Sequence, residues 1–270
     1  FPHLQWIADF RDPWTDIHYY KKLYPMFLAD SLNKFYERKV LHHADKLIVT
    51  CKATLHSFLS KSNKLNKDKF SIITNGFDED DFVNVKENKT DKFVITYIGI
   101  LYNTKDIEVL LSAFSAMKDK GNCCLRFVGH SGIIASEIEK FNLQAYTEIL
   151  PQVKHSTAVQ LMVDSSVLVL LVPKDEKSSA FLPGKLFEYL AARKPILGIA
   201  PKDNEVSEII NQCEAGATFD YTDVEGVLDF LKNKQTEWKS KQTCQLTNNN
   251  YLKYSRRLLT QELNNLIKNV

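Results

Sequence analysis

Short apolar runs of strand length alternate with longer helical patterns along nearly all of this 270-residue sequence. The runs at 93–98 and 167–172 are rich in Ile and Val and show little polar alternation, as expected for strands covered by helices on both faces. Such alternation is typical of parallel βαβ units. The sequence therefore predicts an α/β fold of Rossmann-like parallel sheets with helices on both faces.

The expected elements follow directly from these runs. We expect strands at residues 4–10, 47–50, 70–73, 93–98, 124–128, 145–149, 167–172, 195–199 and 217–219. We expect helices at 25–43, 53–60, 106–118, 158–163, 184–192, 205–212, 223–232 and 251–267. The last helix would carry four leucines on one face, namely Leu252, Leu259, Leu263 and Leu266.

A charged, loop-like stretch at residues 75–91 has few strand formers and predicts a domain boundary. The part before it offers about three strands, too few for a Rossmann-like sheet with its own core, whereas the part after it offers six. We therefore expect the latter part of an N-terminal domain at 1–74, a complete C-terminal domain at 92–249 and a C-terminal helix at 250–270. Because the chain begins with Phe1, we also expect Phe1 to be an interior residue of a longer native protein.

Composition excludes several classes of protein. Lys plus Arg number 35 against 33 Asp plus Glu, so no strong uniform field attracts nucleic acid. The longest strongly apolar run is far shorter than the roughly 20 residues that a membrane-spanning helix needs. The five cysteines are odd in number and lack Cys-x-x-Cys spacing, which predicts reduced thiols in a cytoplasmic protein and neither a disulfide framework nor a zinc site.

The most informative segment is FLPGKLFEYLAARKPILG at residues 181–198. Pro183 and Gly184 suit a helix start, and helical spacing then places Lys185 and Glu188 on one face. Free amides and a lysine at a helix N-terminus attract an anion, and the carboxylate can accept hydrogen bonds from the paired hydroxyls of a ribose. Two interpretations remain open here: a nucleotide site, or an amphipathic helix with a surface Lys–Glu pair, which spacing alone favours.

A second segment, YIGILYNTK at residues 97–105, follows a buried strand, so its loop lies at the sheet edge where open α/β sheets bind ligands. Gly99 has no Cβ to obstruct a diphosphate, and Lys105 can neutralise one. Gly129 and Gly132 end the next strand in the same way. These glycines either shape one cleft or serve only as turn residues.

Taken in order, these segments resemble the donor domain of retaining GT-B glycosyltransferases of the bacterial polysaccharide type, often called glycosyl transferases group 1. The final helix, with YSRRLLT at 254–260, resembles the helix that crosses back to the N-terminal, acceptor-side domain of that family. The segments that carry the resemblance are 6–14 (WIADFRDPW), 73–78 (ITNGFD), 99–105, 128–129, 150–155 (LPQVKH) and 183–196.

The resemblance implies transfer of a sugar from a nucleoside-diphosphate donor, UDP or GDP, to an acceptor hydroxyl, with retained configuration and without an essential metal or other cofactor. It also implies a saccharide or lipid-linked acceptor and a role in cell-surface polysaccharide synthesis. Glu188 matches the glutamate that holds the ribose hydroxyls. The other matching positions are Gly99, Lys105 and Lys185 around the diphosphate, Gln152 and Val153 against the nucleobase, and Gly129 and Gly184 as donor-binding glycines.

The sequence departs from the family pattern at two positions. Many relatives carry a second glutamate eight positions before the ribose-binding one, where this chain has Ala180, and an arginine after the strand glycine, where it has Ile100. The catalytic residues stay unknown. Asp9, Arg11 and Asp12 at the end of a strand face the interdomain cleft if the family pattern holds, or else form a structural ion pair.

Several charged groups have simpler interpretations. Asp78, Asp80 and Asp81 resemble a metal motif, but helix capping or solvated charge is favoured. His42 and His43 end an amphipathic helix and are not proposed as a general base. The lysines at 61, 64, 67 and 69 suit either a solvated loop or peripheral contact with the inner face of the membrane.

Two alternatives to a glycosyltransferase stay open at this point. The first is a nucleotide-sugar epimerase of the same fold, which would change its donor without an acceptor. The second is a non-catalytic nucleotide-binding protein, an interpretation that Ala180 and Ile100 favour slightly and that the intact 183–188 segment opposes.

Overall fold

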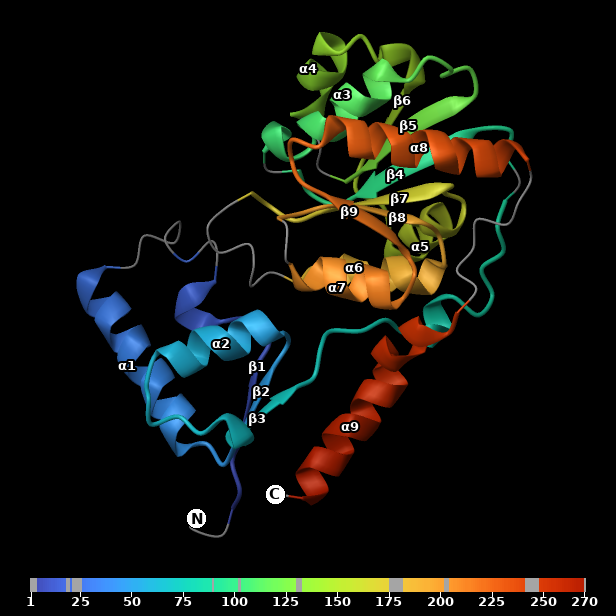
Figure 1. The fold of residues 1–270 in the computed structure, drawn as a ribbon. Coiled ribbons are helices and arrows are strands. Elements are labelled where there is room, and N and C mark those ends of the chain that lie inside the picture. Colours follow the sequence, from blue (N-terminus) through green and yellow to red (C-terminus); the bar gives the residue numbers. More distant parts are fainter. Residues whose placement is uncertain are drawn as a thin grey trace. The chain divides into compact units, whose positions relative to one another are not determined.

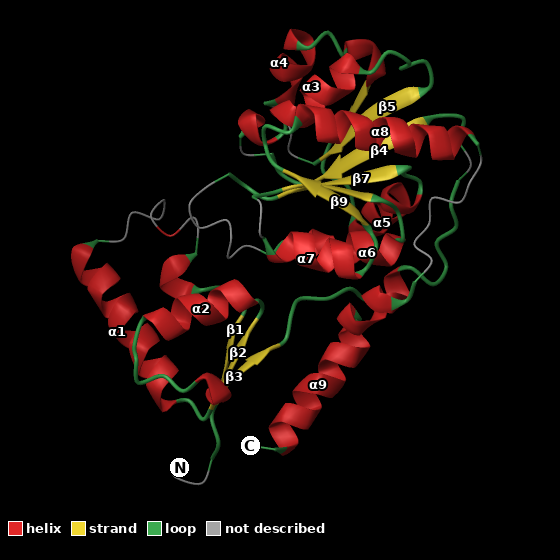
Figure 2. Cartoon of the chain, in the orientation of Figure 1, coloured by secondary structure: helices red, strands yellow, loops and turns green. Residues whose placement is uncertain are grey.

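A computed structural model describes residues 4–17, 20, 26–88, 90–101, 103–129, 133–174, 182–201, 204–240 and 248–269. These residues form two compact units, each an α/β structure, as the sequence predicts (Figures 1 and 2). The smaller unit contains the described residues of 4–76 and 253–269 together with Leu182. The larger unit contains those of 77–174 and 183–252.

Three parallel strands pair in the order β1-β2-β3 among the described residues of the smaller unit. Leu47 and Val49 of the middle strand face a core shared with α1 and α2, whereas Ile48 faces α9. Because both faces are covered, this strand has no polar alternation. The elements are β1 (Ile7–Phe10), α1 (Phe27–His43), β2 (Lys46–Val49), α2 (Lys52–Ser60), β3 (Phe70–Ile72) and α9 (Arg256–Lys268).

Helix α9 begins later than the leucine pattern predicts. Ser255 caps it by accepting a hydrogen bond from the backbone N–H of Leu258 at 3.3 Å. Residues 250–254 form a 3-10 turn instead, and Leu252 in that turn is exposed. The leucines that do pack against the sheet are Leu259, Leu263 and Leu266.

Lys61 belongs to the interior of the smaller unit, so neither a solvated loop nor a membrane surface describes its position. Its ammonium lies 2.6 Å from the Glu37 carboxylate on α1 and 2.9 Å from that of Asp16. Glu37 is almost fully buried and also accepts hydrogen bonds from the backbone and hydroxyl of Thr15. A buried carboxylate requires such partners, and these partners are too far apart in the chain for local spacing to indicate them.

Six parallel strands pair in the order β6-β5-β4-β7-β8-β9 in the described part of the larger unit. The chain moves outward from β4 to β6, returns to the other side of β4 and moves outward again to β9. This is the doubly wound arrangement, and its switch point lies between β4 and β7. The strands are β4 (Phe93–Ile98), β5 (Cys123–Val128), β6 (Thr147–Leu150), β7 (Val167–Leu171), β8 (Ile196–Ile199) and β9 (Gly216–Phe219).

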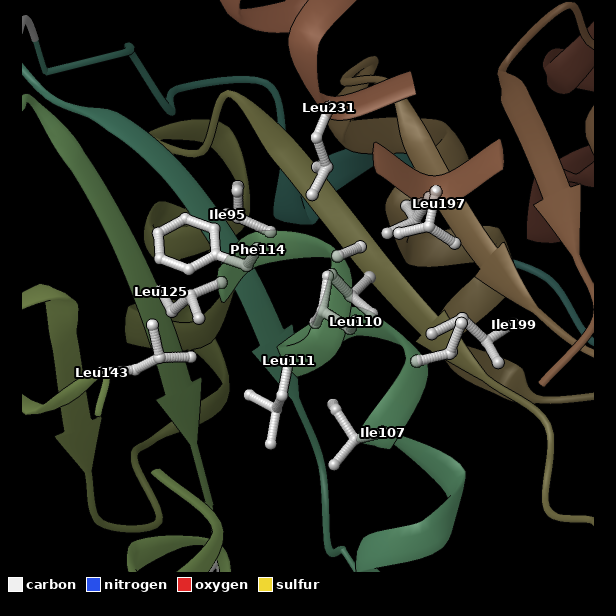
Figure 3. Packing of buried hydrophobic residues seen from close by; sticks show 14 of the residues in the cluster. Ile95, Ile107, Leu110, Leu111, Phe114, Leu125, Leu143, Leu197, Ile199 and Leu231 are labelled. Atoms are coloured by element: carbon white, nitrogen blue, oxygen red, sulfur yellow. The ribbon is translucent and has the colours of Figure 1, made fainter. Parts of the chain in front are cut away.

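Helices cover both faces of this sheet, as Figure 1 shows. One layer consists of α3 (Glu108–Ala116), α4 (Ile134–Lys140) and α8 (Val224–Lys239), and the other of α5 (His155–Val163), α6 (Gly184–Ala192) and α7 (Glu205–Gln212). Figure 3 shows Ile95 of β4 packing with Phe114 of α3 and Leu231 of α8 in the first layer's core. This core fixes the strand ends on which the candidate site stands.

Several predictions in the larger unit are wrong, and three of them have identifiable reasons. Helix α4 was not expected because its buried face consists only of Ile134 and Ile138. Helix α8 continues past residue 232 because Gln235 is buried and donates to the Asp119 carbonyl, although its polar side chain breaks the apolar period. The strand expected at 145–149 begins at Thr147, after a 3-10 turn.

Among the described residues, no helix is long and apolar enough to span a bilayer.

Candidate functional site

Two glycine loops meet at the carboxyl edge of the larger sheet, beside its switch point. Gly99 follows β4 and Gly129 follows β5, and the Gly99 N–H donates to the Val128 carbonyl at 2.9 Å. A Cβ placed on Gly129 would lie 2.5 Å from the Gly99 carbonyl oxygen, and the Gly129 φ is +121°. Only glycine fits there without strain. The structure thus brings these two predicted site residues together.

Helix α6 begins at the same edge, after β7. Pro183 precedes it in extended conformation, and a Cβ placed on Gly184 would meet nothing within 4 Å. The start of α6 therefore has open space beside Gly184, and the N-terminus of a helix is where an anion can approach.

The position of α6 is set by burial and by one hydrogen bond to β4. Leu186, Phe187 and Leu190 are fully buried. The hydroxyl of Tyr189 accepts a hydrogen bond from the backbone N–H of Ile98 at 3.2 Å, and burial raises the pKa of Tyr189. The helix is thereby joined to the strand that ends at Gly99.

Lys185 and Glu188 form an ion pair on the exposed side of α6. The Lys185 Nζ lies 2.7 Å from the Glu188 Oε2, and the two side chains are 35% and 23% exposed. The predicted common face is correct. An ion pair at this spacing is expected both for a nucleotide site and for an ordinary surface pair, so it does not separate the two interpretations. The location of α6 at the switch point favours the ligand site.

His155 and Asp81 extend this ion pair, although neither was predicted as a donor-site residue. The Nε2 of His155, at the start of α5, lies 3.6 Å from the Glu188 Oε1 and 3.7 Å from the Asp81 Oδ2. The available signal was that His155 ends the 150–155 segment that carries the family resemblance. Asp81 lies in the 3-10 turn Glu79–Asp81, whose cap is Asp78, as the capping interpretation predicts.

A metal centre finds no support in the described residues, which contain no group of three His, Cys, Asp or Glu side chains placed to hold an ion.

The sequence comparison with protein families decides the identity. A family model described as Glycosyl transferases group 1 matches residues 78–268. The chain belongs to this family. It is a glycosyltransferase, as the resemblance in the sequence indicates. A search of curated proteins finds no significant match.

Several solved structures share the fold of this chain. Sucrose-phosphate synthase from Thermosynechococcus elongatus matches with a TM-score of 0.71 at 16% identity, over 98% of this chain and 68% of that one. A glycosyltransferase from Rickettsia africae matches with a TM-score of 0.69 at 15% identity, over 97% of this chain and 70% of that one. Anabaena HepE in complex with UDP-glucose matches with a TM-score of 0.69 at 12% identity, over 98% of this chain and 72% of that one. The predicted GT-B fold is confirmed.

The remaining predicted donor-site residues of the glycosyltransferase lie in two loops. Lys105 is exposed in a 3-10 turn, Thr104–Asp106, and not yet in helix α3. The Asp106 carboxylate accepts from the Lys174 backbone at 3.3 Å, which joins the loop after β4 to the loop after β7. Gln152 and Val153 lie in the loop between β6 and His155, with Gln152 exposed.

Arg11 of the glycosyltransferase forms an ion pair with Asp9, which agrees with the interpretation of these residues as a structural ion pair. Its Nε lies 3.1 Å from the Asp9 carboxylate, and its Nη1 donates to the Ile73 carbonyl at 3.5 Å. Asp12 follows it and is exposed. Ile100 is 51% exposed, and Gly132 and Ala180 lie outside the described residues.

Proposed function

We propose that this glycosyltransferase binds a nucleoside-diphosphate sugar, UDP- or GDP-linked, on its larger unit and transfers the sugar to an acceptor hydroxyl. The observation that carries the proposal is the Lys185–Glu188 pair beside the open N-terminus of α6, at the topological switch point. HepE, of the same fold, has been solved with UDP-glucose.

Each predicted donor residue has a proposed role. Glu188 accepts the two ribose hydroxyls, since a carboxylate offers about four lone-pair positions. Gln152 and Val153 present their backbone to the base. Around the diphosphate we place Gly99, Lys105, Gly129, Gly184 and Lys185.

The proposed chemistry breaks the bond between the anomeric carbon and the diphosphate, whose oxygen keeps the electron pair, and forms a bond from that carbon to the acceptor oxygen. The proton of the acceptor hydroxyl is released to the solvent. The departing diphosphate gains negative charge. Lys185, Lys105 and the amides of α6 offset that charge without reorganising, so we propose no essential metal or other cofactor. Retention of configuration is part of the proposal and rests on the family resemblance.

The acceptor side is proposed in broader terms. The acceptor is a saccharide or a lipid-linked saccharide in cell-surface polysaccharide synthesis, and we propose Arg11 and Asp12 as residues on the acceptor side. We propose a cytoplasmic enzyme, because the described cysteines Cys51, Cys123 and Cys124 are buried thiols, as is Cys213.

We propose peripheral membrane contact through α1 rather than through the 61–69 loop. Met26, Phe27, Leu28 and Leu32 are each more than half exposed, and cationic side chains on the same helix suit anionic lipids. Flotation with anionic vesicles checks this, since Phe27→Ser and Leu28→Ser together should abolish co-flotation.

Donor binding is tested by a thermal-shift screen of UDP-glucose, GDP-mannose and their nucleotides. A ligand at 100 times its dissociation constant stabilises by about 2.7 kcal/mol, which raises the melting temperature by about 5–10 °C in a unit of this size. Glu188→Gln should remove the shift. Glu237→Gln, which disrupts a similar Lys–Glu pair on α8, should keep it.

The screen rejects the proposal if no donor raises the melting temperature, or if Glu188→Gln responds like the wild type. Product analysis without an acceptor then separates a transferase from an epimerase, because only the epimerase alters its donor alone.

A further inference from the structure

His155 is held close to Glu188 by the packing of α5. Val159 and Met162, further along this helix, are buried, so the position of its first turn is fixed. His155 itself is 48% exposed, with the Glu188 carboxylate on one side and the Asp81 carboxylate on the other. Three elements, the 79–81 turn, α5 and α6, thus converge on one imidazole.

The link between the ring and the two carboxylates is one of charge. Distances of 3.6 and 3.7 Å exceed hydrogen-bond length, whereas coulombic attraction extends that far. Of the groups that face the ring, Asp81 and Glu188 are acidic, and Lys185 lies behind Glu188 on its other oxygen. A protonated ring is attracted to both carboxylates, and a neutral ring loses that attraction.

Lys185 and His155 lie against different oxygens of the Glu188 carboxylate. Lys185 lies against Oε2 and His155 against Oε1. Since each carboxylate oxygen has two lone pairs, one on each oxygen remains for the two hydroxyls of a ribose. The pair of cations therefore orients the carboxylate without using up its acceptor capacity.

We propose that His155 is a positioning residue for donor binding: its protonated ring, held by Asp81, orients the Glu188 carboxylate toward the ribose and adds positive charge beside the diphosphate. The inference rests on the proposed donor site. It makes donor affinity fall as pH rises, because loss of the ring proton removes the attraction to both carboxylates.

Isothermal titration with UDP-glucose between pH 5.5 and 8.5 tests the inference, with GDP-mannose as the second donor. The diphosphate of a nucleotide sugar has no proton that titrates in this window, so a slope reports the protein. The wild type should bind about threefold to fivefold more tightly at the acidic end, the size expected for a half-exposed charge pair.

Three variants separate charge from structure. His155→Gln should bind like the wild type at pH 8.5 and lose the gain at pH 5.5. His155→Lys, which keeps a cation, should retain tight binding with a flat profile. His56→Gln, at an exposed histidine of α2 in the smaller unit, should match the wild type.

The outcomes distinguish this inference from the proposed function. If the wild type binds and Glu188→Gln does not, but His155→Gln keeps the wild-type affinity and slope, only the role of His155 is overturned. If neither donor binds the wild type, the donor site and the role of His155 fall together. Melting curves without ligand confirm that each variant is folded.

Discussion

Helices α6 and α8 of the larger unit carry nearly the same motif in different places. Each has a lysine and a glutamate three positions apart. The distance from the lysine Nζ to the glutamate Oε2 is 2.7 Å in Lys185–Glu188 and 2.9 Å in Lys234–Glu237. The exposures are also similar, at 35% and 23% against 24% and 35%. Spacing, distance and exposure therefore cannot identify a ligand site.

What differs is where each pair lies in the fold. The α6 pair lies at the start of a helix that follows β7 at the switch point, beside the open space at Gly184 and the His155 imidazole. The α8 pair lies in the second half of a long helix that follows the edge strand β9. The comparison teaches that topology, rather than the pair, makes the site.

The aromatic side chain of α6 is more deeply buried than that of α8, and the largest expected effect on stability tests this difference. Phe187→Ala should lower the free energy of unfolding by about 3–5 kcal/mol, because a fully buried ring leaves a cavity. Phe230 of α8 is only partly buried, against Phe219, so Phe230→Ala should cost clearly less. Urea denaturation measures both. Equal losses would show that the two helices are equally embedded.

The lysines should differ in ligand binding. Lys185→Ala removes the proposed charged partner of the diphosphate and should weaken UDP-glucose binding at least about tenfold, since hydrogen bonds to charged groups contribute about 1.5–3 kcal/mol. Lys234→Ala should leave the affinity unchanged. Calorimetric titration of both variants is the measurement, and equal affinities would remove α6 from the donor site.

The glycines near the two helix starts should respond in opposite ways. A Cβ on Gly226 would lie 2.6 Å from the Asp223 carboxylate that caps α8, so Gly226→Ala should cost about 1–2 kcal/mol. Gly184→Ala meets no neighbour and should not lower stability. It should nevertheless weaken donor binding, because the methyl group occupies the space beside the amides.

Thermal melting with and without UDP-glucose measures both glycine variants. A stable Gly184→Ala protein with undiminished affinity would contradict the proposed approach of the diphosphate.

The smallest expected effect concerns the Cys123 thiol beside α8, which we expect not to react with an alkylating reagent in the folded protein. Burial raises the pKa of the Cys123 thiol to about 11, and Gln235 of α8 lies 3.1 Å from its sulfur. Because the thiolate is the nucleophile, Cys123 should resist iodoacetamide at pH 8 in the folded protein and react after unfolding. Mass spectrometry of labelled peptides checks this, and rapid labelling of the folded protein would show that α8 opens readily.

The sequence by itself determined the architecture and the centre of the candidate site. Buried strands such as Phe93–Ile98 and the whole of α6 were predicted with their observed bounds, because apolar period and the Pro183-Gly184 start are local properties. The common face of Lys185 and Glu188 was predictable for the same reason, since helical spacing depends only on neighbours in the chain.

Only the tertiary structure decided which charges meet. His155 lies near Asp81 and Glu188, and Lys61 near Glu37, although these residues are far apart in the chain. The buried end of α8 likewise depends on Gln235 reaching the Asp119 carbonyl. A polar side chain carries no periodic signal of its own, so its partners are set by how strands and helices pack, and no local pattern reports that.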